Sequence, residues 1–501
     1  MSLHQIIQVL PLEEQRQFIL YLQKKNKRSD TKNIDLFKLI SQDELTSNEI
    51  CAKLYGTKSK DAYHALRKRL HHSLIDFTAN SNLEEENSID MQIIKYILAS
   101  RTLLTHKQYK IAFKVLSKAE TMAQEHSLFA LLNEIYHTKI QYAYTNESED
   151  INELIRKFKL NQEDVFLEDE LNIVYAKIRQ AFNEVTFKGE IVDFKTLVTS
   201  TLETHNITIT DSMSFKSLYQ LMTILSMSAF VTNDFYGLEP FLIDTYRTLL
   251  EKKDKGKQLY YHIQVLYLIA NTLFRNKKFA MSLFYLNLMH GQMLYNRKKY
   301  YNNFKLKYNL LLALNHNYSN KPDIAISILE DFNLKKHNDI EALLDIRLSL
   351  IMCYFQQSEF KKAHSIFSNF YHRDKWYEEK AGKEWVIKKN LIEILLHLEL
   401  GNIDLVESRL LSFKRQYYPY LRSIQQNRVI TYLKFVEHYY KNPMSVKSVE
   451  FFDQVQTSFE WIGAKREDIF VMSFYAWLKS KMEQKPIFEA TMELVEKSQK
   501  S

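Results

Sequence analysis

Glycine and proline are scarce in this chain, with 8 Gly and 6 Pro among its 501 residues. Globular proteins contain on average about 7% glycine and about 5% proline, and β and α/β folds need both residues in their many turns. A protein of this length with such a fold would contain several times as many. The scarcity therefore predicts an all-α fold, and it leaves too few glycines for the backbone loops that cradle nucleotide phosphates.

Cysteine is also rare, and Cys51 and Cys353 are the only two. They lie far apart in the sequence, and each falls within an apolar helical pattern. A disulfide framework or a cysteine metal site requires more thiols at closer spacing. We therefore expect two buried free thiols in a protein of a reducing compartment.

Long apolar runs are absent from the sequence. No uncharged apolar run approaches the roughly 18 residues that a membrane helix needs. The first residues, MSLHQIIQVLPLEEQRQF, lack the basic segment, the apolar core and the small-residue cleavage site of a secretory signal. We therefore expect a cytoplasmic protein that does not associate with membranes.

Enzyme motifs are missing as well. The sequence contains no glycine-rich phosphate loop, no G-x-S-x-G elbow and no H-E-x-x-H. His64 and His71 share a helical face, but their separation of seven residues corresponds to about 10.5 Å along the axis. That distance is too long for one metal ion without further ligands. We expect neither catalysis, nor a cofactor, nor a metal site.

Apolar and aromatic residues are abundant. Apolar residues make up 46% of the chain, which includes 31 Tyr and 31 Phe. This is ample material for a continuous core, and it excludes a disordered chain. The net charge of +8, from 68 basic and 60 acidic residues, permits an acidic partner without requiring one.

A helical hairpin is the clearest local pattern, at residues 346–370. The polar turn Gln356–Glu359 separates two helical segments, and Phe360, Ala363 and Phe367 in the second segment have the spacing of buried positions. Residues 96–119 repeat the pattern with the same order of large, small and aromatic side chains. The small alanine lets two helices approach closely.

This pattern resembles the tetratricopeptide repeat, a helix-turn-helix unit that stacks into a solenoid. The position of Ala363 recurs at intervals of 38 to 44 residues, longer than the standard unit, and is occupied in turn by Leu238, Ser282, Ala325, Ala363 and Val406. The resemblance implies a right-handed α-α superhelix. It also implies a scaffold or adaptor function, in which the groove of the array binds a protein or peptide partner.

Four regions follow from the pattern. Residues 1–82 form a small N-terminal helical domain, 88–200 the first helical hairpin repeats, 213–485 the tetratricopeptide-like array, and 486–501 a C-terminal helix with a fraying tail. The repeat pattern decays around Glu163–Glu170. Either degenerate repeats or an irregular loop would explain that decay.

The N-terminal domain offers an alternative function. A short helix at 49–55, a stop at Gly56 and a basic helix at 62–77 give the outline of a DNA-binding helix-turn-helix, with a linker at 80–90. The protein would then be a transcription regulator with a sensor array. Residues 1–82 contain 13 basic and 9 acidic residues, a modest charge that equally fits a helical cap. The residues expected to contact DNA are Arg67, Lys68 and Arg69.

Two further clusters combine cations with aromatic residues. Cations that follow phosphates beside aromatic stacking surfaces are typical of single-stranded nucleic acid binding, and an acidic protein would also fit them. The alternative is that the aromatic side chains are core and the cations are solvated. The candidate residues are Arg297, Lys298, Lys299, Tyr301 and Lys305 in the first cluster, and Lys414 and Arg415 in the second.

Overall fold

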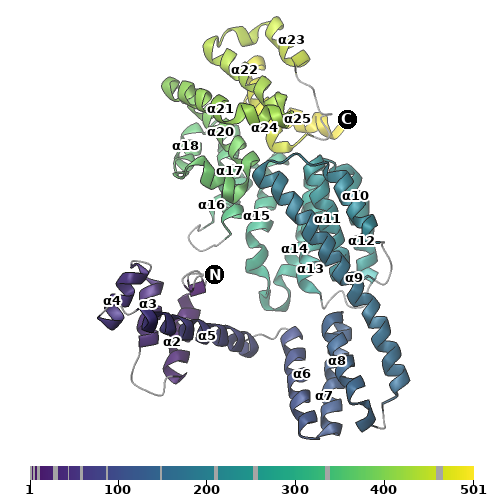
Figure 1. Cartoon of the computed structure of the whole chain (residues 1–501). Helices are drawn as coiled ribbons and strands as arrows, with labels where there is room; N and C mark the ends of the chain where they lie inside the picture. Colours follow the sequence, from purple (N-terminus) through teal and green to yellow (C-terminus); the bar gives the residue numbers. More distant parts are fainter. Residues whose placement is uncertain are drawn as a thin grey trace. The chain divides into compact units, whose positions relative to one another are not determined.

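The computed structural model describes residues 3, 6–7, 12–25, 32–42, 45–56, 60–85, 89–146, 149–207, 213–251, 258–332, 339–458 and 467–500. Within these ranges all regular secondary structure is helical, which confirms the all-α prediction (Figure 1). None of the described helices combines the length and the apolar character that crossing a membrane requires.

The chain divides into two compact units, Met1–Lys159 and Leu160–Ser501. The division falls within one long helix, α9 (Ile151–Asn183), and not in a linker. The acidic stretch Glu163–Glu170 lies inside this helix, so it is neither a loop nor a hairpin. No glycine or proline interrupts residues 151–183, which is consistent with an unbroken helix.

Unit 1 begins with four helices around one apolar core. They are α2 (Leu12–Lys25), α3 (Lys32–Ser41), α4 (Ser47–Tyr55) and α5 (Lys60–Glu85). Thr46 and Glu49 form a capping box at the start of α4, and Gly56 ends it with φ of 66°. Helix α5 continues to Glu85, so the first half of the predicted linker is helical. No glycine or proline lies between residues 60 and 85 to end this helix.

The second part of unit 1 contains α6 (Ile89–Thr105), α7 (Tyr109–Glu125), α8 (Phe129–Gln141), η1 (Ala143–Thr145) and the start of α9. Helices α6 and α7 are the hairpin expected at residues 96–119. Ser100 and Ala112 are fully buried, whereas Ala99 is exposed. The hairpin pattern also predicts Ala99 on the packed face of its helix, and this prediction is wrong, because the buried face of α6 runs through Ile93, Ile97 and Ser100.

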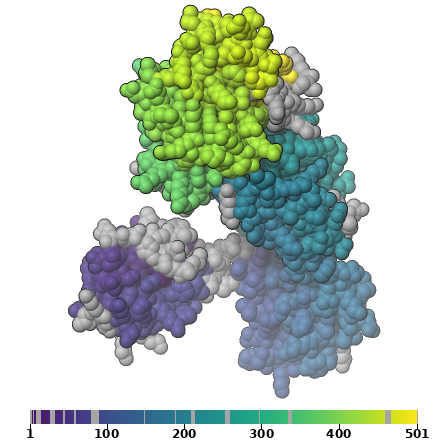
Figure 2. All heavy atoms as spheres, turned by 45° about the horizontal axis from the view of Figure 1, so that its top comes forward, coloured from purple at the N-terminus to yellow at the C-terminus, as the bar shows by residue number. Residues whose placement is uncertain are grey.

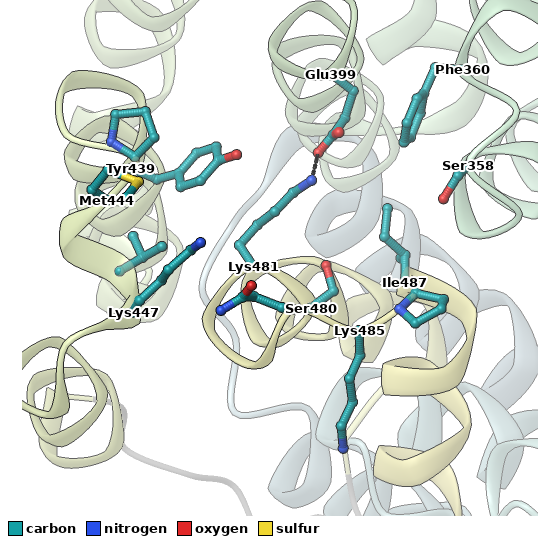
Figure 3. Close-up of a pocket in the computed structure, with 14 residues that line it drawn as sticks. Ser358, Phe360, Glu399, Tyr439, Met444, Lys447, Ser480, Lys481, Lys485 and Ile487 are labelled. Carbon is teal, nitrogen blue, oxygen red and sulfur yellow. Dashed lines mark ion pairs between the residues drawn. The ribbon is translucent and has the colours of Figure 1, made fainter.

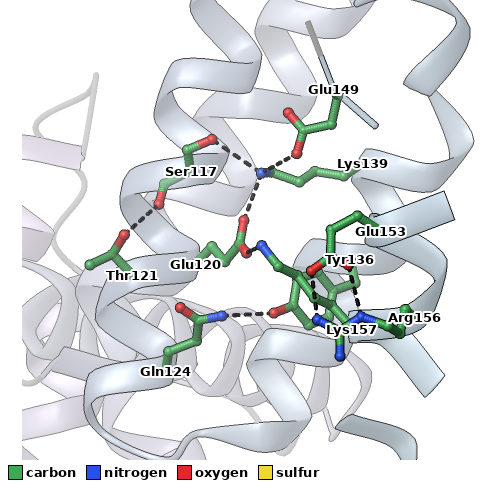
Figure 4. Close-up of polar contacts among 10 residues, drawn as sticks. All are labelled: Ser117, Glu120, Thr121, Gln124, Tyr136, Lys139, Glu149, Glu153, Arg156 and Lys157. Atoms are coloured by element: carbon green, nitrogen blue, oxygen red, sulfur yellow. Dashed lines mark hydrogen bonds and ion pairs between the residues drawn. The ribbon is translucent and has the colours of Figure 1, made fainter. Parts of the chain in front are cut away.

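A buried cation lies between α7, α8 and the loop before α9 (Figure 4). The side chain of Lys139 is 2% exposed, and its Nζ is 2.6 Å from Glu120 Oε2 and 2.9 Å from Glu149 Oε1. Lys139 Nζ also donates to Ser117 Oγ at 3.1 Å. These partners compensate the lysine for the water that it loses on burial.

Helices continue through unit 2. They are α10 (Phe194–Thr204), α11 (Phe215–Thr232), α12 (Phe235–Glu251), α13 (Leu259–Arg275), α14 (Phe279–Lys298), α15 (Tyr301–Tyr318), α16 (Pro322–Glu330), α17 (Ile340–Gln356), α18 (Phe360–Phe367), α19 (Asp374–Ala381), α20 (Lys383–Glu399), α21 (Ile403–Ser423), α22 (Asn427–Lys441), α23 (Val449–Ser458), α24 (Ile469–Glu483) and α25 (Ile487–Lys500), with η2 (Glu184–Lys188) and η4 (Ser445–Lys447). Helices α17 to α22 form one continuous packed mass in the space-filling view (Figure 2).

Five helix pairs of unit 2 share one turn, which also occurs between α21 and α22. In each pair the residue two positions before the second helix has a left-handed backbone, and the next N–H donates to the carbonyl five residues earlier. The left-handed residues are Asn233, Lys277, Asn320, Ser358 and Gly401. Glycine is therefore used in one of these five turns, which explains how a helical chain forms them with so few glycines.

The fourth residue of each second helix is buried. Leu238, Ser282, Ala325, Ala363 and Val406 all occupy this position, with exposures between 0% and 7%, which confirms their predicted equivalence. Ser282 is the polar residue among these five, and its hydroxyl donates to the Ala270 carbonyl at 2.8 Å. The same sequence pattern also predicts burial of Ile403, the first residue of α21, and this prediction is wrong, because Ile403 is 60% exposed, whereas Phe235 and Phe279 at the start of α12 and α14 are buried.

Packing follows the order of the chain. The first helices of successive pairs, α11, α13, α15, α17 and α20, contact one another in sequence, and each second helix contacts the first helix of the next pair. The C-terminal helices depart from this order, because α25 contacts α17 and α24 contacts η4. The tail expected to fray is helical to Lys500, since Gln499 donates to the Lys277 carbonyl at 2.8 Å and Ser498 is buried.

Candidate functional site

Helix α24 and the two residues before it contact the C-terminal ends of four first helices. Each of these ends is followed by the left-handed turn of its pair. The contacts are Lys277 Nζ to the Glu467 carbonyl (2.7 Å), Tyr318 Oη to Ser473 Oγ (3.3 Å), Gln356 Nε2 to Ser473 Oγ (2.8 Å) and Trp477 Nε1 to Glu399 Oε1 (2.6 Å). Helix α24, which is distant from them in the sequence, therefore contacts four successive helix pairs.

A cavity of about 490 Å³ opens beside this helix (Figure 3). This volume lies within the range of small-molecule sites, about 300–1,000 Å³. Its walls come from the α17–α18 turn, the end of α20, the α22–η4 segment and the α24–α25 turn. The lining residues are Ser358, Phe360, Glu399, Tyr439, Pro443, Met444, Val446, Lys447, Ser480, Lys481, Gln484, Lys485, Pro486 and Ile487.

Three lysines line the cavity, and they differ in their partners. Lys481 Nζ lies 2.6 Å from Glu399 Oε1. Lys485 pairs with Glu493 and Glu483, whose hydrogen bonds raise its pKa to about 12, and its side chain points away from the cavity in Figure 3.

The third lysine, Lys447, has no ion pair within the part of the chain that the structure describes. Its side chain extends into the cavity, as does that of Tyr439 (Figure 3). Burial, together with the negative charge of Glu399, raises the pKa of Tyr439, so its hydroxyl stays protonated and can donate. A lysine without an ion pair and a neighbouring hydroxyl donor can together bind a carboxylate, through one ion pair and one hydrogen bond.

A second polar site, which we call the Asp468 cluster, joins α13, α20 and the start of α24. Asp468 Oδ2 lies 3.3 Å from Arg275 Nη1, and Asp468 Oδ1 lies 3.7 Å from Lys388 Nζ. Lys388 Nζ is also 2.9 Å from Glu384 Oε1. Burial alone would raise the pKa of Asp468, but the charges of Lys388 and Arg275 outweigh burial and lower it. The cluster therefore holds ionised groups that stabilise one another.

Asp345 on α17 is the unusual acid near this cluster. Burial, followed by repulsion from Glu341, raises its pKa to about 7, against the opposing charges of Lys388 and Arg275. The side chain remains partly exposed. A carboxyl group that titrates near neutral pH is a common feature of functional sites, although structural networks also produce it.

The predicted DNA-contact residues lie on α5. Lys68 and Arg69 are exposed, whereas Arg67 is half-buried, with its guanidinium 5.7 Å from the centre of the Tyr63 ring. The short helix α4, the turn after Gly56 and the long helix α5 agree with the expected order of elements. The DNA-binding function stays a prediction.

The first cation-aromatic cluster falls at the turn between α14 and α15. Arg297, Lys298 and Lys299 are exposed, and Lys298 and Lys299 lie over the rings of Tyr301 and Tyr300 at 5.9 Å and 5.3 Å. Both tyrosines are partly buried against the core. Their rings already have cationic and apolar neighbours within the chain.

The other aromatic residues of this cluster belong to the core. Phe304 is 3% and Tyr308 is 8% exposed. Lys305 lies 5.8 Å from the centre of the Phe332 ring. These two buried rings cannot serve as stacking platforms, so the core interpretation holds for them.

The second cluster lies on α21. Lys414 Nζ pairs with Glu437 Oε2 of α22 at 2.6 Å, whereas Arg415 is exposed. Tyr417 is 2% exposed, and its hydroxyl donates to Asp374 Oδ2 at 3.0 Å. Of the two predicted cations, Arg415 is thus the one that remains exposed to a ligand.

The expected thiols and histidines can also be placed. Cys51 and Cys353 are both buried and free, and burial raises the pKa of Cys353 to about 12. Within the described residues, His, Cys, Asp and Glu form no group of three or more that could hold a metal ion. His64 is exposed and His71 is half-buried on α5.

The cavity was not foreseen. Glu399, Lys447 and Lys481 belong to three elements spread over more than eighty residues, and none of them stands in a recognisable motif. The one sequence signal would have been the two prolines, Pro443 and Pro486, which follow the ends of helices at the cavity wall.

No protein-family model matches the chain, and none of the curated proteins compared with it is significantly similar.

Proposed function

We propose that the protein is a non-enzymatic scaffold or adaptor whose helix pairs stack as a right-handed, tetratricopeptide-like solenoid and bind a protein or peptide partner. The repeated turn, the buried fourth residue and the serial packing of first helices support the solenoid. The observation that carries the binding function is the cavity beside α24, with Lys447 uncommitted inside it.

The cavity defines the chemistry of the partner. Lys447 and the Tyr439 hydroxyl would bind a carboxylate of a peptide, while Phe360 and Met444 would contact an adjacent apolar side chain. The hydrogen bonds and ion pairs of α24 hold these walls in place before the partner binds. Such preorganisation lowers the entropic cost of binding.

A pulldown from cell lysate with the full-length chain tests this function. Wild type should recover defined partners, and Lys447→Glu should lose them because it places a like charge beside the partner carboxylate. Lys375→Glu is the matched control, since Lys375 is exposed on α19 and away from the cavity lining. An unchanged partner set in Lys447→Glu, or no partner above background in wild type, would contradict the proposal.

The second candidate is a helix-turn-helix regulator. It is favoured by the exposed Lys68 and Arg69 on α5, directly after the capped helix α4. The test is fluorescence anisotropy of labelled duplex DNA with the full-length chain. Binding should weaken steeply with salt, and replacing Arg67, Lys68 and Arg69 together by Ala should remove it.

The matched control for the DNA experiment replaces Arg297, Lys298 and Lys299 together by Ala, because these cations are equally exposed on another element. If this control loses DNA binding and the α5 variant retains it, the first cation-aromatic cluster is the nucleic-acid site. Absence of salt-dependent binding in wild type would exclude the regulator function.

A further inference from the structure

Helix α14 is apolar on both of its faces. Its inner face is core, with Tyr285, Leu286, Met289 and Met293 buried. Its outer face carries large apolar side chains that are between 39% and 63% exposed, namely Met281, Phe284, Leu288, Leu294 and Tyr295. A helix at a protein surface normally has a polar outer face, and apolar residues all round indicate a helix that is covered on every side. Among the residues that the structure describes, the outer face of α14 therefore lacks a partner.

The spacing of this face matches a helical partner. Met281, Phe284, Leu288, Gly291 and Tyr295 follow one another at alternating steps of three and four, the repeat of a coiled-coil seam. Asn287 is exposed beside Leu288, at a position that flanks the seam. We call this face the α14 seam.

Gly291 adds a geometric argument. It is exposed, and a Cβ atom added there would have no other heavy atom within 4 Å. Its φ is not in the left-handed region, so the backbone does not require glycine at this point. The missing side chain instead leaves open space in the middle of the seam, where another helix can approach closely.

Charge selects among the occupants of the seam. Its C-terminal end meets Arg297, Lys298 and Lys299, which are exposed and have no ion pair within the described ranges. Its N-terminal end meets Lys278, whose Nζ is 2.7 Å from Glu239 Oε1.

Two parallel α14 helices of two copies of this chain would set cations opposite cations, because Arg297 to Lys299 would face themselves. Two antiparallel helices would bring these cations near Lys278, whose charge Glu239 already balances, so they would gain less there than from unpaired acidic residues. Acidic residues at the end of a different helix would instead meet opposite charge.

We propose that the α14 seam docks an amphipathic helix of another protein, with apolar residues in a heptad pattern and acidic residues that meet Arg297, Lys298 and Lys299. This surface is separate from the cavity beside α24, since α14 contributes no residue to the cavity lining. The protein would thus have two docking sites of different chemistry, one for a carboxylate-bearing peptide and one for an acidic helix.

The probe is a labelled synthetic peptide of three heptads, with leucine at the a and d positions and glutamate on the flanks. A second peptide carries lysine in place of each glutamate. Anisotropy with the full-length wild type should show binding of the glutamate peptide and at least tenfold weaker binding of the lysine peptide. Replacing Arg297, Lys298 and Lys299 together by Glu should reverse that preference. Non-specific hydrophobic binding to an apolar surface would not produce such a reversal.

The double variant Phe284→Ser and Leu288→Ser should weaken binding of the glutamate peptide about tenfold or more, because these side chains lie at the centre of the seam. Leu411→Ser is the control, since Leu411 is 67% exposed on α21. Equal binding by the double variant and wild type, or no binding by wild type, would overturn the proposal. Self-association of wild type that the double variant abolishes would also overturn it, in favour of a second copy.

Discussion

The hairpin α6–α7 of unit 1 and the hairpin α17–α18 of unit 2 have the same turn around different interiors. Lys107 and Ser358 are left-handed, with φ of 58° and 60°, and the following N–H closes each turn at 2.9 Å. Ala112 and Ala363 occupy the same position, and both are fully buried. The backbone of the pair is therefore independent of what the rest of the core contains.

The interiors beyond that alanine differ in charge. Helix α7 itself buries a charged residue, Glu120, against Lys139, whereas the residues that α17 and α18 themselves bury are uncharged, Gln356 among them. A buried ion pair contributes little net stability but is costly to break, and apolar packing is sensitive to volume. The two hairpins should thus fail in different ways.

The largest expected effect is in the charged interior. Lys139→Met should destabilise unit 1 by about 3–5 kcal/mol, because it leaves Glu120 and Glu149 without their main buried partner. The measurement is urea unfolding of the full chain, with hydrogen exchange followed in residues 109–158. Arg156→Met is the control: its pair with Glu153 is on the surface and should contribute little to stability. Equal losses in the two variants would show that burial of the charge does not matter.

The apolar interior should respond to added volume. Ala363→Leu should cost about 1–3 kcal/mol, because Ala363 is fully buried and the larger side chain overpacks the contact between α17 and α18. Hydrogen exchange should accelerate in α16 to α21 while α7 keeps its protection, since an array need not share stability along its length.

Ala99→Leu is the control for added volume, because Ala99 is exposed and the change should be close to neutral. Uniform acceleration from end to end in Ala363→Leu would mean that one cooperative core includes both units. Unchanged exchange would mean that the site accommodates the larger side chain.

Local patterns in the sequence predicted the common part of this comparison. The spacing around Ala363 found the second helices, and the five equivalent positions are buried as expected. These features depend on residues within one or two turns of each other, where helical periodicity is informative. The scarcity of glycine and proline predicted the fold class.

The distinct parts could not be predicted from local patterns. Lys277 bonds to Glu467, 190 residues away, and Gln499 bonds to Lys277, 222 residues away. No periodicity encodes such contacts, so the position of α24 and the cavity beside it were missed. The sequence showed where cations and aromatic residues cluster, yet the aromatic residues Phe304 and Tyr308 of the first cluster are core. One sequence cannot distinguish an aromatic ring that stacks on a ligand from one that is buried.

A third prediction adds pH to the comparison, through Asp345 in unit 2. With a pKa of about 7, this carboxyl keeps its proton in the folded protein at pH values where the unfolded chain, at its ordinary value of 3.8, has lost it. Stability should therefore fall as pH rises from about 4 to about 7. Asp345→Asn should remove that fall and stabilise unit 2 at pH 8 by about 1–2 kcal/mol, less than the full shift implies because the side chain is partly exposed.

The measurement for Asp345 is the urea midpoint of the full chain between pH 4 and pH 8. Asp323→Asn is the control, since Asp323 is exposed in the first turn of α16. A fall in stability that persists unchanged in Asp345→Asn would assign the pH dependence to other groups.

The smallest expected effect tests whether the two turns are the same in energy as well as in shape. A non-glycine residue in the left-handed region is strained by roughly 1–2 kcal/mol, whereas glycine is not, although glycine loses more freedom on folding. Lys107→Gly and Ser358→Gly should each stabilise their unit by a net of about 0.5–1 kcal/mol, since both side chains are exposed. Gly401→Ala, at a φ of 72°, should destabilise by about 1 kcal/mol and serves as the inverse control. The urea midpoints of the three variants provide the measurement. Opposite signs at Lys107 and Ser358 would show that the interior, charged in one hairpin and apolar in the other, sets the strain of the turn.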